Sequence, residues 1–73
     1  MSQTVQTEVT VAGMTCGHCV AAVTEELTAL PGVVDVAVDL HAGEDSPVTI
    51  TSAAPLERAA VESAVTEAGY TLR

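Results

Sequence analysis

Two cysteines separated by two residues are the residues of this chain most able to do chemistry. They lie in the run Gly13-Met14-Thr15-Cys16-Gly17-His18-Cys19. Two thiolates at this spacing can bind one metal ion together, or they can close into a disulfide. The run therefore indicates either a metal site or a redox dithiol.

The small number of donors near the pair favours a metal that needs few ligands. A closed structural zinc site takes four donors, whereas Cys16 and Cys19 supply two. His18 is held between the cysteines, and His41 is far along the chain. Two thiolates suit a soft, closed-shell ion, which in a cell is Cu(I), or adventitiously Ag(I) or Hg(II). Because such an ion stays open to a third sulfur from another protein, we expect a Cu(I) site suited to metal transfer.

A strand before the cysteine pair and a helix after it are expected to position the thiols. Apolar and polar residues alternate over residues 5–11, the period of a strand with one face in water. Apolar residues then recur every three or four positions over residues 20–30, as on an amphipathic helix. The cysteines therefore lie where a strand ends and a helix begins.

This junction is expected to favour the thiolate form of the cysteines. Cys19 falls in the first helical turn, where unpaired N–H groups carry partial positive charge, and Cys16 falls in the loop just before it. We expect Gly17 to let the loop bend so that both sulfurs face one point, and Gly13 to relax the exit from the strand.

The middle of the chain is expected to form a hairpin. Pro31-Gly32 ends the first helix, and residues 33–40 then read as a second strand. Residues 41–46 have turn composition, and alternation resumes over residues 47–51 as a third strand. The expected buried face of the second strand consists of four residues: Val34, Val36, Val38 and Leu40.

A second helix and a short final strand complete the predicted fold. Pro55 is expected to be the first helical residue, with Glu57 and Glu62 near the positive helix end, and Gly69 to cap the other end. Its buried stripe is expected to comprise Leu56, Ala60, Val61, Ala64, Val65 and Ala68. Residues 70–72 supply the last strand. The order strand, helix, strand, strand, helix, strand predicts a two-layer α+β sandwich, a single domain over residues 1–73.

Composition and charge exclude several classes of partner. Ten acidic residues against two basic ones give a net charge of −8, and Tyr70 is the only aromatic residue. Such a chain repels nucleic acids and anionic membranes and attracts proteins rich in lysine and arginine. Because the chain shows neither a secretory signal nor a membrane-spanning stretch, we expect it in the cytoplasm, where thiols stay reduced.

The residues around the cysteine pair resemble the heavy-metal-associated domain, and among its members the bacterial CopZ-type copper chaperones. The resemblance rests on the run of residues 13–19 between a strand and a helix, and on Pro31-Gly32-Val33 and Ala68-Gly69-Tyr70 after the two helices. It implies a ferredoxin-like fold, a four-stranded antiparallel sheet with two helices on one face. It also implies Cu(I) bound by Cys16 and Cys19 and transferred to a copper-transporting P-type ATPase or to a copper-responsive repressor.

Roles are expected for four neighbouring residues, those of Met14 and Tyr70 from the resemblance and those of Thr15 and His18 from their places in the loop. Met14 is expected to pack under the loop, and Thr15 to hydrogen-bond within it. His18 is expected to tune the thiolates or to join a copper-bridged homodimer. Tyr70 is expected to approach the loop, where its ring shields the site and its hydroxyl reaches a sulfur. Lysines, which family chaperones carry near the site, are absent from this chain, so the family's usual charge-guided docking is in doubt.

Four alternatives remain open from the sequence. A small thiol–disulfide oxidoreductase would use the same pair, although a thioredoxin-like protein needs a longer chain. A Hg(II) carrier and a zinc carrier are the competing metal functions. The chain could also be an excised domain of an ATPase rather than a stand-alone protein.

Overall fold

The structure, a computed structural model, describes residues 4–73; Met1, Ser2 and Gln3, which the predicted single domain included, lie outside the described residues. It contains six elements in the predicted order. They are β1 (Val5–Ala12), α1 (Gly17–Thr28), β2 (Val33–Val38), β3 (Ser46–Ser52), α2 (Arg58–Glu67) and β4 (Thr71–Leu72).

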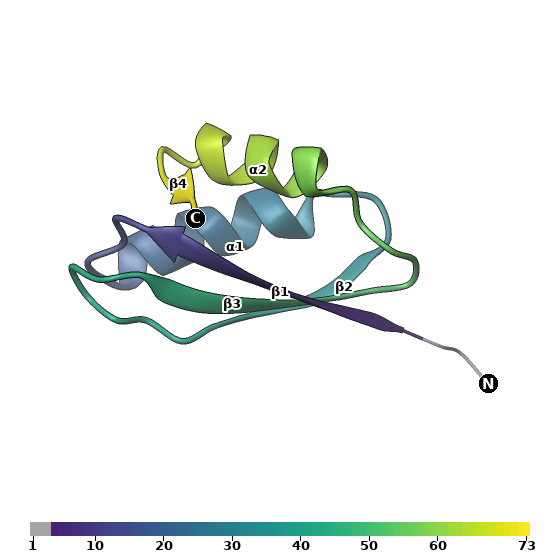
Figure 1. Cartoon of the computed structure of the whole chain (residues 1–73), viewed down its shortest axis with the longest axis horizontal. Helices are drawn as coiled ribbons and strands as arrows, with labels where there is room; N and C mark the ends of the chain where they lie inside the picture. Colours follow the sequence, from purple (N-terminus) through teal and green to yellow (C-terminus); the bar gives the residue numbers. More distant parts are fainter. Residues whose placement is uncertain (1–3) are drawn as a thin grey trace.

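The strands form one antiparallel sheet in the order β2-β3-β1-β4, and both helices cover the same face of it (Figure 1). The predicted ferredoxin-like fold is therefore confirmed. β1 occupies an inner position and pairs with β3 without a break from Val5 to Val11. Because β1 leads directly into α1, this central strand anchors the cysteine loop to the sheet.

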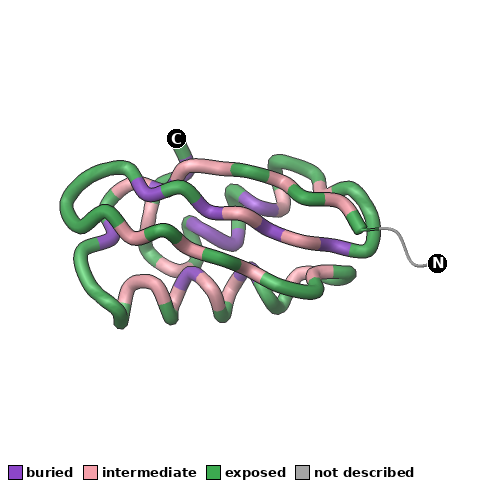
Figure 2. Tube along the Cα trace, turned by 90° about the horizontal axis from the view of Figure 1, so that it is seen from below, coloured by how far each residue is buried: buried purple, intermediate pink, exposed green. Residues whose placement is uncertain are grey.

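The core lies between the sheet and the helices and is almost wholly aliphatic (Figure 2). Its fully buried members include Val23 and Leu27 from α1, which confirms the predicted apolar stripe of that helix. Two buried serines are satisfied by hydrogen bonds: the His41 N–H donates to Ser46 Oγ at 2.9 Å, and Ser52 Oγ donates to the Ala54 carbonyl at 2.7 Å. No unsatisfied polar side chain is therefore buried among the described residues.

The second strand differs from its prediction at both ends. β2 stops at Val38, and its pairing with β3 shifts register between Val33 and Asp35. The irregularity inverts the alternation at the start of the strand. Val33 packs against the core instead, and Val34, which we expected on the buried face, is 63% exposed.

The second helix begins later than predicted. Pro55 lies outside α2, whose N-cap is Glu57 in an extended conformation, with its carbonyl accepting the first helical hydrogen bonds from Ala60 and Val61. Leu56 precedes the cap and packs against the core that contains Val61. This pattern is that of a hydrophobic staple, which fixes the helix start after Leu56. Glu62 consequently lies beyond the first turn, in which no acidic residue is found.

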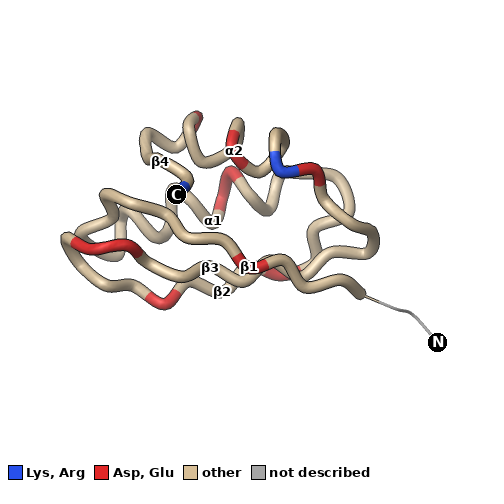
Figure 3. The backbone as a smooth tube through the Cα atoms, viewed as in Figure 1, with Lys and Arg blue, Asp and Glu red and all other residues tan. Residues whose placement is uncertain are grey.

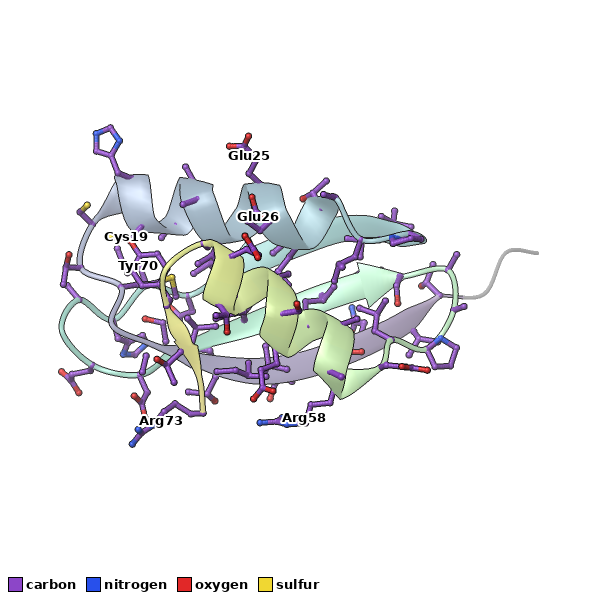
Figure 4. All side chains as sticks on the ribbon, turned by 90° about the horizontal axis from the view of Figure 1, so that it is seen from above. Cys19, Glu25, Glu26, Arg58, Tyr70 and Arg73 are labelled. Carbon is purple, nitrogen blue, oxygen red and sulfur yellow. The ribbon has the colours of Figure 1, made fainter. Side chains whose placement is uncertain are left out.

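The end of α2 agrees with the prediction. Gly69 has a φ of +94°, and the next N–H, that of Tyr70, donates to the Val65 carbonyl at 3.1 Å. A left-handed residue at this place reverses the chain sharply. The reversal turns the chain back before β4 begins and brings Tyr70 beside Cys19, in the first turn of α1 (Figure 4).

Charge is distributed unevenly over the surface (Figure 3). Acidic residues lie on strands, helices and turns, while the two arginines lie at the start of α2 and at the C-terminus. The Arg58 guanidinium donates to the Arg73 carbonyl at 3.1 Å, and the Arg73 guanidinium lies 3.5 Å from an Asp45 carboxylate oxygen. Both cations are thus engaged within the chain, and neither is near the cysteine loop in sequence.

Candidate metal site

The cysteine loop spans the short connection between β1 and α1. Cys16 is the N-cap of α1 and has an extended backbone, with φ −157°. Its carbonyl accepts hydrogen bonds from the N–H groups of Cys19 and Val20, so Cys19 lies in the first helical turn as predicted. One thiol therefore stands on the loop and the other on the rigid helix.

The two thiols face each other at bonding distance for a shared metal. The sulfur atoms of Cys16 and Cys19 are 3.7 Å apart. This distance is too long for a disulfide, which needs about 2.05 Å, yet short enough for one ion to contact both. Cys16 is exposed and Cys19 is half-buried. A sulfur from another molecule can therefore approach the pair.

The surroundings of Cys19 favour its thiolate. The pKa of this thiol is lowered from its ordinary 9.0 to about 6, first by the backbone N–H of Thr15, then by the hydroxyls of Tyr70 and Thr15, and then by the backbone of Cys16. Each of these groups directs positive hydrogen at the sulfur and stabilises negative charge. Cys19 is consequently a ready metal ligand at neutral pH.

Thr15 and Tyr70 reach Cys19 in different ways. Thr15 Oγ1 lies 3.7 Å from the Cys19 sulfur. Tyr70 lies next to Cys19 (Figure 4), and hydrogen bonding by its hydroxyl is the second cause of the lowered pKa of that thiol. The proximity of the thiolate raises the pKa of Tyr70 in turn. Two hydroxyls, one local and one from the far end of the chain, therefore surround the helix-borne thiol.

The ring of Tyr70 also packs over the exit from β1. Gly13 has a φ of +96°, and a Cβ built on it would meet Tyr70 Cδ1 at 3.5 Å. The glycine therefore allows the sharp turn into the loop, as expected. Gly17 behaves differently: it is the first helical residue, its φ is not positive, and an added Cβ would meet nothing within 4 Å. The expectation that Gly17 bends the loop was wrong, since Gly17 already belongs to α1 and the left-handed residue of the loop is Gly13.

Met14 is completely buried and packs in the core beneath the loop. Its carbonyl accepts a hydrogen bond of 3.1 Å from the N–H of Gly43, a residue of the turn between β2 and β3. This support of the loop by a distant turn was missed from the sequence, and nothing in the spacing of residues 41–46 could have revealed it. The thioether of Met14 is not exposed to an ion on the surface.

His18 does not join the thiols in the structure. It is exposed on the first turn of α1, and the described residues contain no group of three or more His, Cys, Asp or Glu side chains placed to hold a metal. The structure thus brings together Cys16, Cys19, Thr15 and Tyr70. The arrangement places two sulfur atoms within reach of one ion, with no third His, Cys, Asp or Glu donor beside them among the described residues.

Comparisons with known proteins give the chain its relatives. The family model of the heavy-metal-associated domain matches residues 8–71. The chain is 46% identical over 66 residues to Copper-transporting ATPase 2 of Rhizobium meliloti (strain 1021), covering 90% of this chain. It is 37% identical over 65 residues to the COP-associated protein of Helicobacter felis, covering 89% of this chain and 94% of that protein. The solution structure of Copper-S46V CopA from Bacillus subtilis superposes with a TM-score of 0.69 at 32% identity, covering 97% of this chain and 91% of that one.

These relatives differ greatly in length. The chain spans 8% of Copper-transporting ATPase 2 and 7% of Copper-transporting ATPase 1 of the same organism. Within residues 4–73, no helix has the length and apolar character needed to cross a bilayer.

Proposed function

Because this chain belongs to the heavy-metal-associated domain family, we propose that it binds Cu(I) through Cys16 and Cys19 and transfers the ion to a partner by thiolate exchange. The observation that carries the proposal is the pair of sulfurs 3.7 Å apart, one on an exposed and one on a half-buried cysteine, with the pKa of Cys19 lowered to about 6 and no third donor beside them within the described chain. The similarity to a copper-transporting ATPase and to a COP-associated protein supports copper as the cargo.

The number of donors beside the pair, rather than the distance between the sulfurs, supports a metal with low coordination number. With a metal–sulfur bond of about 2.3 Å, as for zinc, a linear site would need sulfurs about 4.6 Å apart. The pair would therefore have to open from 3.7 Å on binding, and we expect the exposed Cys16 side chain to move while Cys19 stays on the helix. A four-coordinate zinc site would instead require two donors that the described surroundings do not offer. Cu(I) therefore suits this site better than zinc.

Transfer is proposed to proceed through a three-coordinate intermediate. A thiolate from the acceptor binds the ion first, and the bond to Cys16 then breaks. The bond to Cys19 breaks last, after a second acceptor thiolate has bound. No electron moves, and each released thiolate can take up a proton from solvent. Because the ion is never without ligands, tight binding and rapid transfer are compatible.

We propose that the acceptor is the metal-binding domain of a copper-transporting P-type ATPase, with a copper-responsive repressor as the other candidate. Two protomers sharing one ion through their exposed loops would form a copper-bridged homodimer, which His18 could join. The proposed setting is the cytoplasm, where the thiols remain reduced, and the proposed role is a non-enzymatic single domain. The charge of −8 favours acceptors with basic surroundings.

Self-exchange between two copies of the chain tests the transfer step. Unlabelled protein loaded with one Cu(I) is mixed anaerobically with metal-free ¹⁵N-labelled protein, and native mass spectrometry follows the arrival of copper in the heavy copy. Thiolate exchange predicts a rate that rises in proportion to the concentration of the acceptor. A rate independent of acceptor concentration would mean that copper dissociates first. The control acceptor, with Cys16→Ser and Cys19→Ser together, should receive no copper.

A thiol–disulfide oxidoreductase is the second candidate, because a thiol with a pKa of about 6 is also a capable attacking and leaving group. Reduction of insulin with a thiol reductant, in the presence of a copper chelator, distinguishes the two functions. The copper-transfer proposal predicts no turnover above that of the double serine variant. Turnover that survives the chelator would favour the oxidoreductase.

A further inference from the structure

The outer edge of β1 is open along most of its length. On one side β1 pairs with β3 over seven residues, from Val5 to Val11, whereas on the other side β4 pairs only with Val11 and Ala12. The N-terminal half of β1 runs away from β4 toward the far end of the molecule (Figure 1). Within residues 4–73 no strand covers this part of the edge.

The backbone groups that face this edge can be identified. The Arg73 N–H donates to the Thr10 carbonyl at 2.7 Å, so the backbone of Thr10 faces the β4 side. In an antiparallel ladder the N–H and C=O of one residue face the same side, and successive residues alternate. Since the pairing with β3 is unbroken, Gln6 and Glu8 also face outward. Their two N–H and two C=O groups form the free edge.

The side chains along this edge are complementary to a second copy of themselves. Val5, Thr7 and Val9 are half-buried on the helix-covered face, and Gln6 and Glu8 are exposed on the other. An antiparallel copy centred on Thr7 places Val5 opposite Val9 of the partner subunit. It places Gln6 opposite Glu8 of the partner subunit, so two amide–carboxylate pairs form and no like charges meet.

The neighbouring register and the other sheet edge are less suitable. A copy centred on Glu8 would bring two carboxylates together and would place Gln6 of the partner subunit opposite Thr10, whose carbonyl already accepts from Arg73. A copy centred on Thr7 places only Thr4 of the partner subunit there, outside β1 and outside the four exchanged hydrogen bonds. The edge of β2 is interrupted by its register shift between Val33 and Asp35, and Asp35 adds charge there. Such irregularity and charge protect an edge from pairing. The β1 edge has a regular ladder, and of these two registers the one centred on Thr7 is favoured.

We propose that the chain forms an antiparallel homodimer through β1, with the two-fold axis at Thr7 and the backbone groups of Gln6 and Glu8 exchanging four hydrogen bonds. The last residue of β1, Ala12, lies about 17 Å along the strand from that axis. The two cysteine loops therefore point to opposite ends of the dimer. This association is independent of copper, unlike a copper-bridged pair, and it leaves both thiol sites open to acceptors.

The charge of −8 on each copy opposes this association, and salt screens the repulsion. Sedimentation equilibrium of the metal-free, reduced chain is therefore expected to detect a dimer at about 1 mM protein, with a population that rises with ionic strength. The double variant Cys16→Ser, Cys19→Ser should associate equally. A monomer at every concentration and salt, or a dimer lost with the cysteines, would overturn the proposal.

Two substitutions test the register. Glu8→Pro removes an outward N–H without touching the β3 ladder and should abolish the dimer, with folding checked by circular dichroism. Gln6→Lys places a cation opposite Glu8 of the partner subunit. It should lower the dissociation constant of the dimer at least about twofold more than Thr51→Lys does. Thr51 is the matched control because it pairs with Gln6 inside the chain, on the same sheet face, and changes the charge equally. Equal effects of the two lysines would exclude this interface, whatever the proline variant does.

Discussion

At the scale of single residues, Cys19 is the most perturbed group of the site. Its thiol has four favourable neighbours and a pKa of about 6, and the first of them is the backbone N–H of Thr15. A main-chain donor cannot be removed by changing a side chain. The thiolate character of Cys19 therefore derives mainly from the conformation of the loop, and Tyr70 and Thr15 add to it.

The lowered pKa of Cys19 makes the stability of the fold depend on pH. Because the folded pKa lies below the ordinary 9.0, the thiolate contributes stability that is complete above pH 9 and is lost as the pH falls through about 6. The free energy of unfolding should therefore rise between pH 6 and 9 more steeply than in Cys19→Ser. Urea denaturation at a series of pH values measures this difference. If the free energy of unfolding changes with pH equally in the two proteins, the lowered pKa of Cys19 is contradicted.

Tyr70→Phe tests the hydroxyl next to the thiol while keeping the ring that packs over Gly13. Loss of the hydroxyl should move the midpoint of Cys19 alkylation to higher pH, measured with iodoacetamide in a Cys16→Ser background. Thr71→Val removes an exposed hydroxyl from the following residue and should leave the midpoint unchanged. If Tyr70→Phe also leaves it unchanged, Tyr70 acts only through packing.

At the scale of elements, the turn between β1 and α1 depends on one glycine and not on the other. Gly13→Ala places a side chain at φ +96° against Tyr70 and should lower the free energy of unfolding by about 1–2 kcal/mol. Gly17→Ala, in the first helical turn with open space around it, should raise it by about 0.5 kcal/mol. Chemical denaturation of the two variants gives the comparison, and equal losses would contradict the assigned turn.

The elements themselves could be predicted from the sequence because their periods are clear. The alternation of residues 5–11 and the three- to four-residue spacing over residues 20–30 each admit one interpretation, and both were confirmed. The run of Val33 and Val34 admits two, since either valine can face the core. Only pairing with β3 decides between them, and the irregularity at Asp35 selects Val33.

In the candidate site, too, features set by neighbouring residues could be predicted, whereas contacts between residues distant in sequence could not. The spacing of Cys16 and Cys19 at a helix start follows from adjacent residues, and it was predicted. The approach of Tyr70 was expected only from the family resemblance, because it depends on how α2 returns to the sheet. The hydrogen bond from Gly43 to Met14 was missed, since it joins two loops that are distant in sequence.

At the scale of the whole molecule, the net charge of −8 is the dominant electrostatic feature. Among the described residues, the ion pair of Arg73 with Asp45 is exposed and weak, and the contact of His41 with Asp39 is an exposed hydrogen bond. Repulsion among the remaining carboxylates should therefore destabilise the fold at low salt. Added sodium chloride should raise the melting temperature, with a neutral osmolyte as the control. A melting temperature lowered by salt would mean that attractive pairs dominate.

The central claim is that Cys16 and Cys19 hold Cu(I) and prefer it to zinc. The most direct test is an anaerobic competition titration of the reduced chain against a chromophoric Cu(I) chelator, repeated with excess zinc present. We expect one Cu(I) per chain to be retained against the chelator, unchanged by zinc, and retention to be lost in Cys16→Ser and in Cys19→Ser. Loss of copper from the unaltered chain to a weak chelator, or its displacement by zinc, would contradict the account.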